Sequence, residues 1–134
     1  MGPVALAEGE LEVVFTRDHS VDDGRFANNG WCQELPDPIT KITWDNVMSV
    51  SRKTAEKLKL VNGELAELTL KGQSVKGRSV KGPIWVQPGM ADNTVALPLG
   101  YDRKGKLRIA NFNYEGKTKG QPVGGFNAYQ VRAS

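Results

Sequence analysis

Frequent glycine and proline residues constrain this chain more than any other sequence feature. The 134 residues include 15 glycines and 7 prolines, and the apolar runs between them are short. Glycine and proline interrupt helices and central strands, so short apolar or alternating runs between them are typical of β-strands. The sequence therefore predicts a single domain, mainly β, with about seven short strands.

The expected strands follow from apolar content and from flanking turn residues. Residues 11–15 and 47–50 are short apolar runs, and residues 64–71 alternate leucine or alanine with charged side chains. Alternation with period two places one set of side chains on the core face of a sheet. The same criteria predict further strands within 74–89, 93–100, 107–114 and 126–132.

One helix is expected, between the second and third strands. Ser51 is a suitable N-cap for residues 52–59, in which Ala55 and Leu58 mark one apolar face. Gly63 follows in an Asn-Gly pair, which supplies the positive φ of a tight turn. One short helix among several strands favours a closed β-barrel over a sheet covered by helices.

The tetrapeptide SVKG occurs twice, at 74–77 and 79–82. The two copies are offset by an odd number of residues, and strand side chains alternate with period two, so the copies face opposite sides of any regular strand. The sequence therefore predicts a bulge or a loop extension in this region.

Charge divides the chain into an acidic and a basic part. Residues 1–50 carry nine acidic and three basic side chains, whereas residues 51–134 carry six and fifteen. The basic surplus lies in 71–82 and 102–120, where lysine and glycine are typical of hairpin tips and loops. Lys76 and Lys81 are alternatively placed to meet a phosphate, but the stretch 102–120 fits no RNA-binding signature, so nucleic acid is not the expected partner.

Cysteine and histidine content limits the possible chemistry. Cys32 and His19 are the single residues of their kinds. They exclude an internal disulfide and leave no ligand set for a structural zinc ion or an iron-sulfur cluster. No apolar run is long enough to span a membrane. The sequence contains no phosphate-binding loop and no recognisable set of nucleophile and base, so neither a metal ligand nor a catalytic residue is predicted.

Residues 25–46, RFANNGWCQELPDPITKITWDN, show neither helical nor strand periodicity and are expected to form a long irregular connection. Together with three other stretches they carry a family resemblance. Residues 51–70, SRKTAEKLKLVNGELAELTL, resemble the S-x-x-T/D-A-x-x-L-x-L-x-x-G-D/E-x-V-x-L segment in the C-terminal, dinucleotide-binding domain of molybdopterin oxidoreductases. The combination of 26–46, 83–103 and 124–129 resembles the molybdopterin-oxidoreductase-like subunit of alternative complex III, and the similarity runs from about Leu11 to Arg132.

The resemblance implies a double-psi β-barrel, also called an aspartate-decarboxylase-like barrel, formed by one domain over residues 1–134 with a loose extension at 1–10. In the wider superfamily this domain covers the pterin dinucleotide, and the metal ligand comes from another domain. The chain alone is therefore not expected to catalyse. In the alternative complex III branch the subunit is a scaffold without molybdenum cofactor, so no cofactor is expected in this chain alone.

The same resemblance implies a place in a respiratory electron-transfer complex that oxidises quinol. The chain is then a fragment of a larger subunit on the periplasmic side of a membrane, and its partners are the other domains or subunits of that complex. Two alternatives remain open. One is a module that binds molybdopterin guanine dinucleotide in an active molybdenum or tungsten oxidoreductase, similar to the small dinucleotide-binding subunit of formylmethanofuran dehydrogenase. The other is a barrel that acts as a nucleic acid or protein adaptor.

Five candidate cofactor contacts lie in the connection 25–46. Asn28 and Asn29 precede a glycine and suit a turn, although their amides can also recognise a pterin or a nucleotide edge. Trp31, like Trp44, is either a core or interface aromatic or a surface on which a base stacks. The other two candidates are Asp45 and Asn46, which match positions where cofactor-bearing relatives contact the dinucleotide but also form an ordinary turn sequence.

The remaining candidates lie later in the chain. Gln87 belongs to a Gln-Pro-Gly turn, in a region where related enzymes approach the cofactor. Asn127 follows two glycines that allow close approach of a ligand, or that simply form a bend. Cys32 is expected to be a half-buried apolar filler without an activated thiolate, and His19 a surface loop residue.

Overall fold

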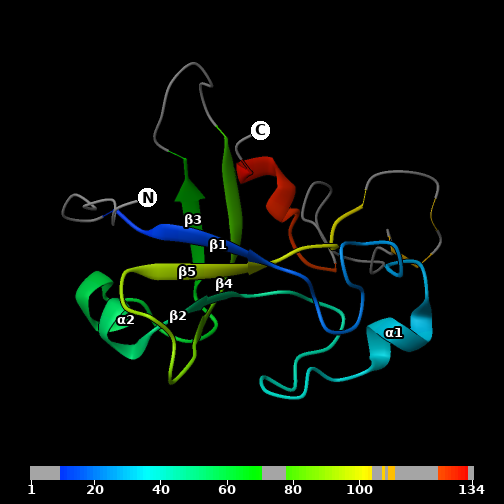
Figure 1. Ribbon diagram of the computed structural model, residues 1–134, viewed down its shortest axis with the longest axis horizontal. Helices are drawn as coiled ribbons and strands as arrows, with labels where there is room; N and C mark the ends of the chain where they lie inside the picture. The colour runs from blue at the N-terminus through cyan, green and yellow to red at the C-terminus, as the bar shows by residue number, and fades with distance from the viewer. Residues whose placement is uncertain (1–9, 71–77, 104–106, 108, 111–123, 133–134) are drawn as a thin grey trace, which may run out of the picture.

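The computed structural model describes residues 10–70, 78–103, 107, 109–110 and 124–132. These residues form a mainly β structure with one mixed sheet, two short α-helices and one 3₁₀-helix (Figure 1). The strands are β1 (Glu12–Thr16), β2 (Met48–Val50), β3 (Leu65–Thr69), β4 (Ser79–Val86) and β5 (Thr94–Pro98), and the helices are α1 (Gly30–Glu34), α2 (Arg52–Leu58) and η1 (Ala128–Val131).

The five strands lie in the order β1-β5-β2-β4-β3. β1 is parallel to β5 and β2 is parallel to β4, whereas the β2–β5 and β3–β4 pairs are antiparallel. The sheet is strongly twisted, and β3 and β4 run steeply across β1 and β5 in the view of Figure 1. β1 and β3 are the two edges, and the described strands do not close into a barrel. The prediction of a mainly β fold is confirmed.

Helix α2 forms where the sequence predicts it, between β2 and β3. The Thr54 N–H donates to Ser51 Oγ at 3.1 Å, and the Ser51 hydroxyl donates to the carboxylate of Asp92 at 2.8 Å. This N-cap therefore also fixes the helix to the segment that leads into β5. The helix ends at Lys59, which takes the left-handed conformation with φ of 56°, and Gly63 has φ of +81° in the following turn.

Strand β4 runs through Gly82 and Pro83, where the sequence suggests a break between two segments. The second SVKG copy continues without a break through Gly82 and Pro83, and β4 pairs with β3 over Ser79–Pro83 and with β2 over Ile84–Val86. The Ile84 N–H donates to Glu64 on the β3 side, so the ring nitrogen of Pro83 points to the β2 side, beyond the end of β2. No ladder hydrogen bond is lost there. The first copy, with Lys76, and the predicted bulge at 71–77 lie outside the described residues.

Two predicted strands differ from the structure. Residues 126–132 contain η1 instead, because the spacing of buried Ala128 and Val131 suits one helical turn that packs against the sheet. In 107–114, the described residues 107, 109 and 110 belong to no strand, and the others lie outside the described residues. Most of the expected loose extension at 1–10 also lies outside them.

The connection 25–46 contains a helix that the sequence does not reveal. Helix α1 has five residues, and Gln33 is its one buried side chain, so it has no apolar face toward the core from which a helical period could be recognised. The expectation that this whole segment is irregular is therefore wrong. Figure 1 places α1 at the end of the molecule opposite α2.

The described residues have two buried apolar clusters. The larger one lies on the sheet and includes Met48, Val50, Ile84, Val95 and Leu97. A smaller one lies among the loops and consists of Val21, Ala27, Tyr101 and Ala110. The second cluster supports the loop end of the molecule, where most of the candidate site residues lie.

Candidate functional site

A cavity of about 190 Å³ lies where β1 and β5 lead into the loops. Side chains of Asp45, Asn46 and Gln87 line it, so the structure brings three of the predicted site residues together. Its apolar part comes from Ile39, Ile42, Val47, Met90, Ala96 and Pro98. The cavity is smaller than the about 300 to 1,000 Å³ that small-molecule sites commonly enclose.

The cavity is acidic. Asp18, Asp37 and Asp45 line it together with Tyr101, and none of the described residues that line it is lysine, arginine or histidine. Burial raises the pKa of the Tyr101 phenol well above its usual range, and the charge of Asp18 and a hydrogen bond to it act in the same direction. Tyr101 is therefore a neutral hydrogen-bonding group here.

Two opposing effects act on the pKa of Asp37. Burial raises the pKa of its carboxyl group, but the N–H groups of Thr40 and Ile39, which donate to Oδ1 at 2.7 and 2.8 Å, outweigh burial and the pKa is lowered. The carboxylate is therefore ionised near neutral pH and contributes negative charge to the cavity.

Asn46 is a structural residue. It is 3% exposed, and its Nδ2 donates to the carbonyl oxygens of Pro98 at 2.9 Å and Phe126 at 3.0 Å. Its Oδ1 accepts from the Phe126 N–H at 2.7 Å. Both amide hydrogens and the amide oxygen thus hold the end of β5 against the segment that leads into η1. A ligand would have to displace these bonds.

Gln87 and Asp45 also have partners within the protein. Gln87 Oε1 accepts from Trp85 Nε1 at 3.1 Å, and its Nε2 donates to the Pro88 carbonyl at 3.3 Å. Asp45 is exposed, and its Oδ1 accepts from the Asn46 N–H at 2.8 Å. Gln87 therefore acts in its own turn, and Asp45 places a carboxylate at the cavity.

Asn28, Asn29 and Trp31 lie away from the cavity. Asn29 is the N-cap of α1 and accepts from the Trp31 N–H at 3.1 Å. Asn28 Oδ1 accepts from the N–H groups of Ile109 and Ala110 at 3.0 and 3.3 Å. Asn28 therefore lies in a turn and Asn29 caps a helix, and neither residue has positive φ. Trp31 is 85% exposed, so its interpretation as a core residue is wrong, whereas Trp44 is half-buried.

Asn127 lies apart from the other candidates. It caps η1 by accepting from the Tyr129 N–H at 3.0 Å, and it lines a second hollow of about 690 Å³ beside Arg25 and Arg103. Both cations have partners, since Arg103 Nη1 donates to the Gly24 carbonyl at 2.6 Å and Arg25 binds acidic neighbours. Asn127 therefore does not complete the site around Asn46.

Three further residues bear on the sequence predictions. Cys32 is a half-buried free thiol and His19 is exposed, as expected. Lys81 lies 3.6 Å from a carboxylate oxygen of Glu67 on the neighbouring strand. The basic side chain that the second SVKG copy supplies therefore has a cross-strand partner.

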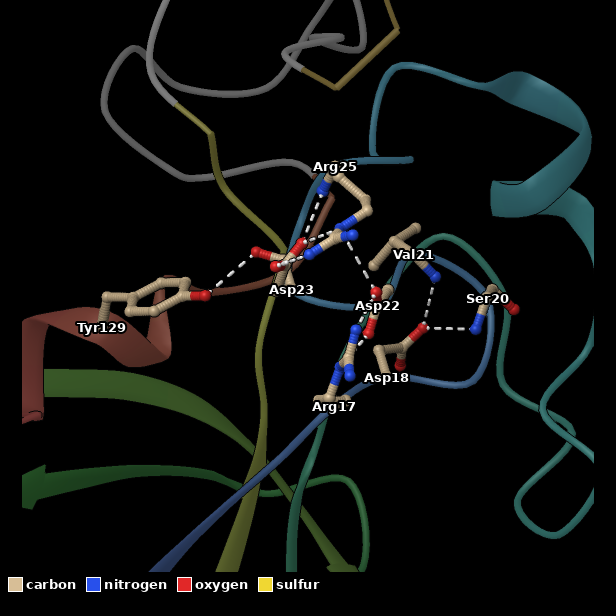
Figure 2. A network of polar contacts seen from close by, with 8 residues as sticks. All are labelled: Arg17, Asp18, Ser20, Val21, Asp22, Asp23, Arg25 and Tyr129. Carbon is tan, nitrogen blue, oxygen red and sulfur yellow. Dashed lines mark hydrogen bonds and ion pairs between the residues drawn. The ribbon is translucent and has the colours of Figure 1, made fainter.

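A network of acidic and basic side chains around residues 17–25 is not predicted from the sequence (Figure 2). Asp22 forms ion pairs with Arg17 and with Arg25, and Arg25 Nη2 also lies 2.8 Å from Asp23. The hydrogen bond from Arg25 holds the pKa of Asp23 well below its usual range. The alternating charges of RDHSVDDGR are the signal that could have indicated it.

The network fixes the loop beside the cavity. Asp18 Oδ2 accepts from the N–H groups of Ser20 and Val21 at 2.8 and 2.9 Å, and the hydroxyl of Tyr129 donates to the Asp23 carbonyl at 3.1 Å (Figure 2). These bonds tie the loop to η1 and hold Asp18 at the cavity.

The acidic cavity does not suit a pterin dinucleotide. Its pyrophosphate needs cations or free N–H groups, and the cavity presents carboxylates. The amide of Asn46 is already bonded within the fold, and the cavity volume is below that of common small-molecule sites. No three His, Cys, Asp or Glu side chains of the described residues are grouped so as to hold a metal ion. None of the described helices has the length and apolar character needed to cross a membrane.

No family model and no curated protein matches this chain.

Proposed function

We propose that this chain is a non-catalytic structural domain whose loop end binds protein, within a respiratory oxidoreductase that oxidises quinol. The main support for a structural role is the side-chain amide of Asn46, which joins the end of β5 to the segment before η1 through three hydrogen bonds. Asn46, the most buried of the candidate cofactor contacts, thus stabilises the fold. The small acidic cavity supports the same role, because it disfavours a dinucleotide.

The assignment to an oxidoreductase rests on the sequence resemblance in residues 26–46, 51–70, 83–103 and 124–129. On that basis the partners are other domains or subunits of a membrane-associated complex related to alternative complex III, and the domain lies on the periplasmic side of the membrane. The chain is then part of a larger polypeptide.

The full fold in this proposal is a double-psi β-barrel. It is supported by the two parallel pairs, β1–β5 and β2–β4, which are joined by the antiparallel β2–β5 pair. Closure requires a further strand between the edges β1 and β3. Glu12 donates to Asn93 toward β5, so the N–H groups of Val13 and Phe15 point away from β5. A closed barrel protects these two amides from hydrogen exchange, and rapid exchange of both contradicts closure.

Cofactor content tests the non-catalytic role. The chain is expressed in a host that makes molybdopterin guanine dinucleotide, and acid extracts of the purified protein are assayed for pterin fluorescence and for guanine nucleotide. We expect neither, and no turnover of quinol analogues or artificial dyes. Cofactor added to a parallel sample before extraction verifies recovery. Stoichiometric pterin or guanine contradicts the proposal and favours a cofactor-binding module.

The oxidoreductase assignment has a separate test. The coding sequence around this chain is expected to contain cysteine-rich, ferredoxin-like motifs, either in the same reading frame or in an adjacent one. Flanking sequence without any redox module contradicts the assignment. Salt-sensitive binding to arbitrary duplex DNA instead favours the adaptor alternative.

A further inference from the structure

Large apolar side chains are exposed on the connection that contains α1. Trp31 is 85% exposed, Leu35 52% and Ile39 71%. Trp31 and Leu35 are separated by one helical turn, because the Leu35 N–H donates to the Trp31 carbonyl, and they therefore lie on the same side of α1. The helix buries a polar residue, Gln33, and leaves its apolar residues in solvent.

These side chains adjoin the acidic cavity. Ser20 lines the cavity, and its hydroxyl donates to the Leu35 carbonyl at 3.1 Å. Ile39 is itself a lining residue, between the carboxylate of Asp37 and the turn that returns to Asp45. Trp31, Leu35 and Ile39 are therefore exposed on the connection that borders the cavity. These three side chains and the cavity make up the α1 face.

The charge around the α1 face is mainly negative. Residues 17–46 carry six carboxylates and three cationic side chains. Arg17 and Arg25 are engaged by Asp22 and Asp23, and Lys41 Nζ donates to the Pro38 carbonyl at 3.0 Å. None of these three cations lines the cavity with Asp18, Asp37 and Asp45. Charge complementarity therefore selects a cationic occupant.

We propose that the α1 face binds a basic and apolar segment of another protein, with one lysine or arginine side chain in the acidic cavity. The apolar residues that line the cavity suit the methylene stem of such a side chain, and the carboxylates of Asp18, Asp37 and Asp45 suit its charged end. Exposed Trp31 supplies the large aromatic contact that commonly dominates protein interfaces. The inference rests on the proposed protein-binding role of the loop end and adds the chemistry of the partner.

Selection from a random peptide library on phage tests the proposal. The immobilised protein is the complete 134-residue chain. Enriched sequences are synthesised, and their affinity is measured for the wild type, Trp31→Ala and Asp45→Asn. Both altered side chains are exposed, and asparagine keeps an oxygen that accepts the bond from the Asn46 N–H. Leu65→Ala on β3, 73% exposed, and Glu56→Gln on α2 are the matched controls.

We expect enriched peptides to carry lysine or arginine flanked by large apolar residues. Each of the two α1-face variants should weaken their binding at least about tenfold, whereas the two controls should not. Raising the salt concentration to about 1 M should also weaken binding, because it screens the charge of the cavity.

Three results overturn the proposal: no enrichment, enrichment of peptides without a cation, or equal binding by Trp31→Ala and the wild type. Self-association of the free chain that Trp31→Ala abolishes also overturns it, because the occupant is then a second copy. Failure here leaves the structural role intact when no cofactor is found in the purified protein. Binding of a pterin or guanine nucleotide in the cavity removes both proposals.

Discussion

Replacing Asn46 with alanine distinguishes between two roles of this residue, one in stabilising the fold and one in binding a cofactor. In the structure the Asn46 amide makes three hydrogen bonds, two to Phe126 and one to Pro98, and its side chain is buried. Alanine removes all three bonds and leaves the Phe126 N–H, formerly bonded at 2.7 Å, without its acceptor. If Asn46 served a cofactor instead, its removal would change ligand binding and leave the stability of the free protein nearly unchanged.

The expected loss follows from the contacts. A buried donor left unsatisfied costs about 1 to 3 kcal/mol, and each of the two bonds from Nδ2 contributes about 0.5 to 1.5 kcal/mol. The free energy of unfolding should therefore fall by about 2 to 6 kcal/mol, with about 4 kcal/mol as the central value. This is a large part of the about 5 to 15 kcal/mol that stabilises a typical domain.

Urea unfolding followed by tryptophan fluorescence measures this loss. With a dependence of about 2 kcal/mol per molar urea, the midpoint should fall by about 2 M. Asn127→Ala is the matched control, because Asn127 is half-exposed and caps only η1, and its loss should cost about 1 kcal/mol. An Asn46→Ala variant within about 0.5 kcal/mol of the wild type refutes the framework role.

Three further perturbations test the fold by the same unfolding measurement. Gly63→Val should cost about 1 to 2 kcal/mol, because Gly63 has φ of +81° and a β-branched residue is strained there; wild-type stability means that the turn is misassigned. Gly82→Ala should cost about 1 to 3 kcal/mol, because its Cβ would lie 2.3 Å from a ring carbon of Phe126; an unchanged midpoint contradicts this packing. The hydrogen bond from Ser51 lowers the pKa of Asp92 below its usual 3.8. The ionised Asp92 therefore stabilises the fold above that pH, and this stabilisation is lost as the pH falls through the lower pKa of the folded state. Asp92→Asn should remove this part of the acid sensitivity, and equally steep acid destabilisation of both proteins contradicts the expectation.

Local chemistry explains which elements are predictable from the sequence. The serine cap at Ser51 and the alternation in residues 64–71 act within a few residues, and both α2 and β3 form where they are expected. Strand β4 is different, because Gly82 and Pro83 suggest a break. The structure tolerates them since the Pro83 nitrogen points beyond the end of β2, and this depends on a pairing between distant segments.

The candidate site is predictable only in part for the same reason. Asp45, Asn46 and Gln87 do line one cavity, but the bonds that occupy the Asn46 amide come from Pro98 and Phe126, far along the chain. Helix α1 buries no apolar side chain, so no hydrophobic period indicates it. A local sequence pattern identifies polar residues, and only tertiary contacts decide whether their hydrogen-bonding groups remain available to a ligand.

We propose above all that the cavity beside Asn46 belongs to a structural, protein-binding domain and does not hold a pterin dinucleotide. Calorimetric titration of the intact chain with guanosine monophosphate and, separately, with a soluble pterin tests it most directly. No saturable binding is predicted for either compound up to about 1 mM, for the wild type or for Asp45→Asn. Saturable one-to-one binding by the wild type that Asp45→Asn weakens would contradict the account.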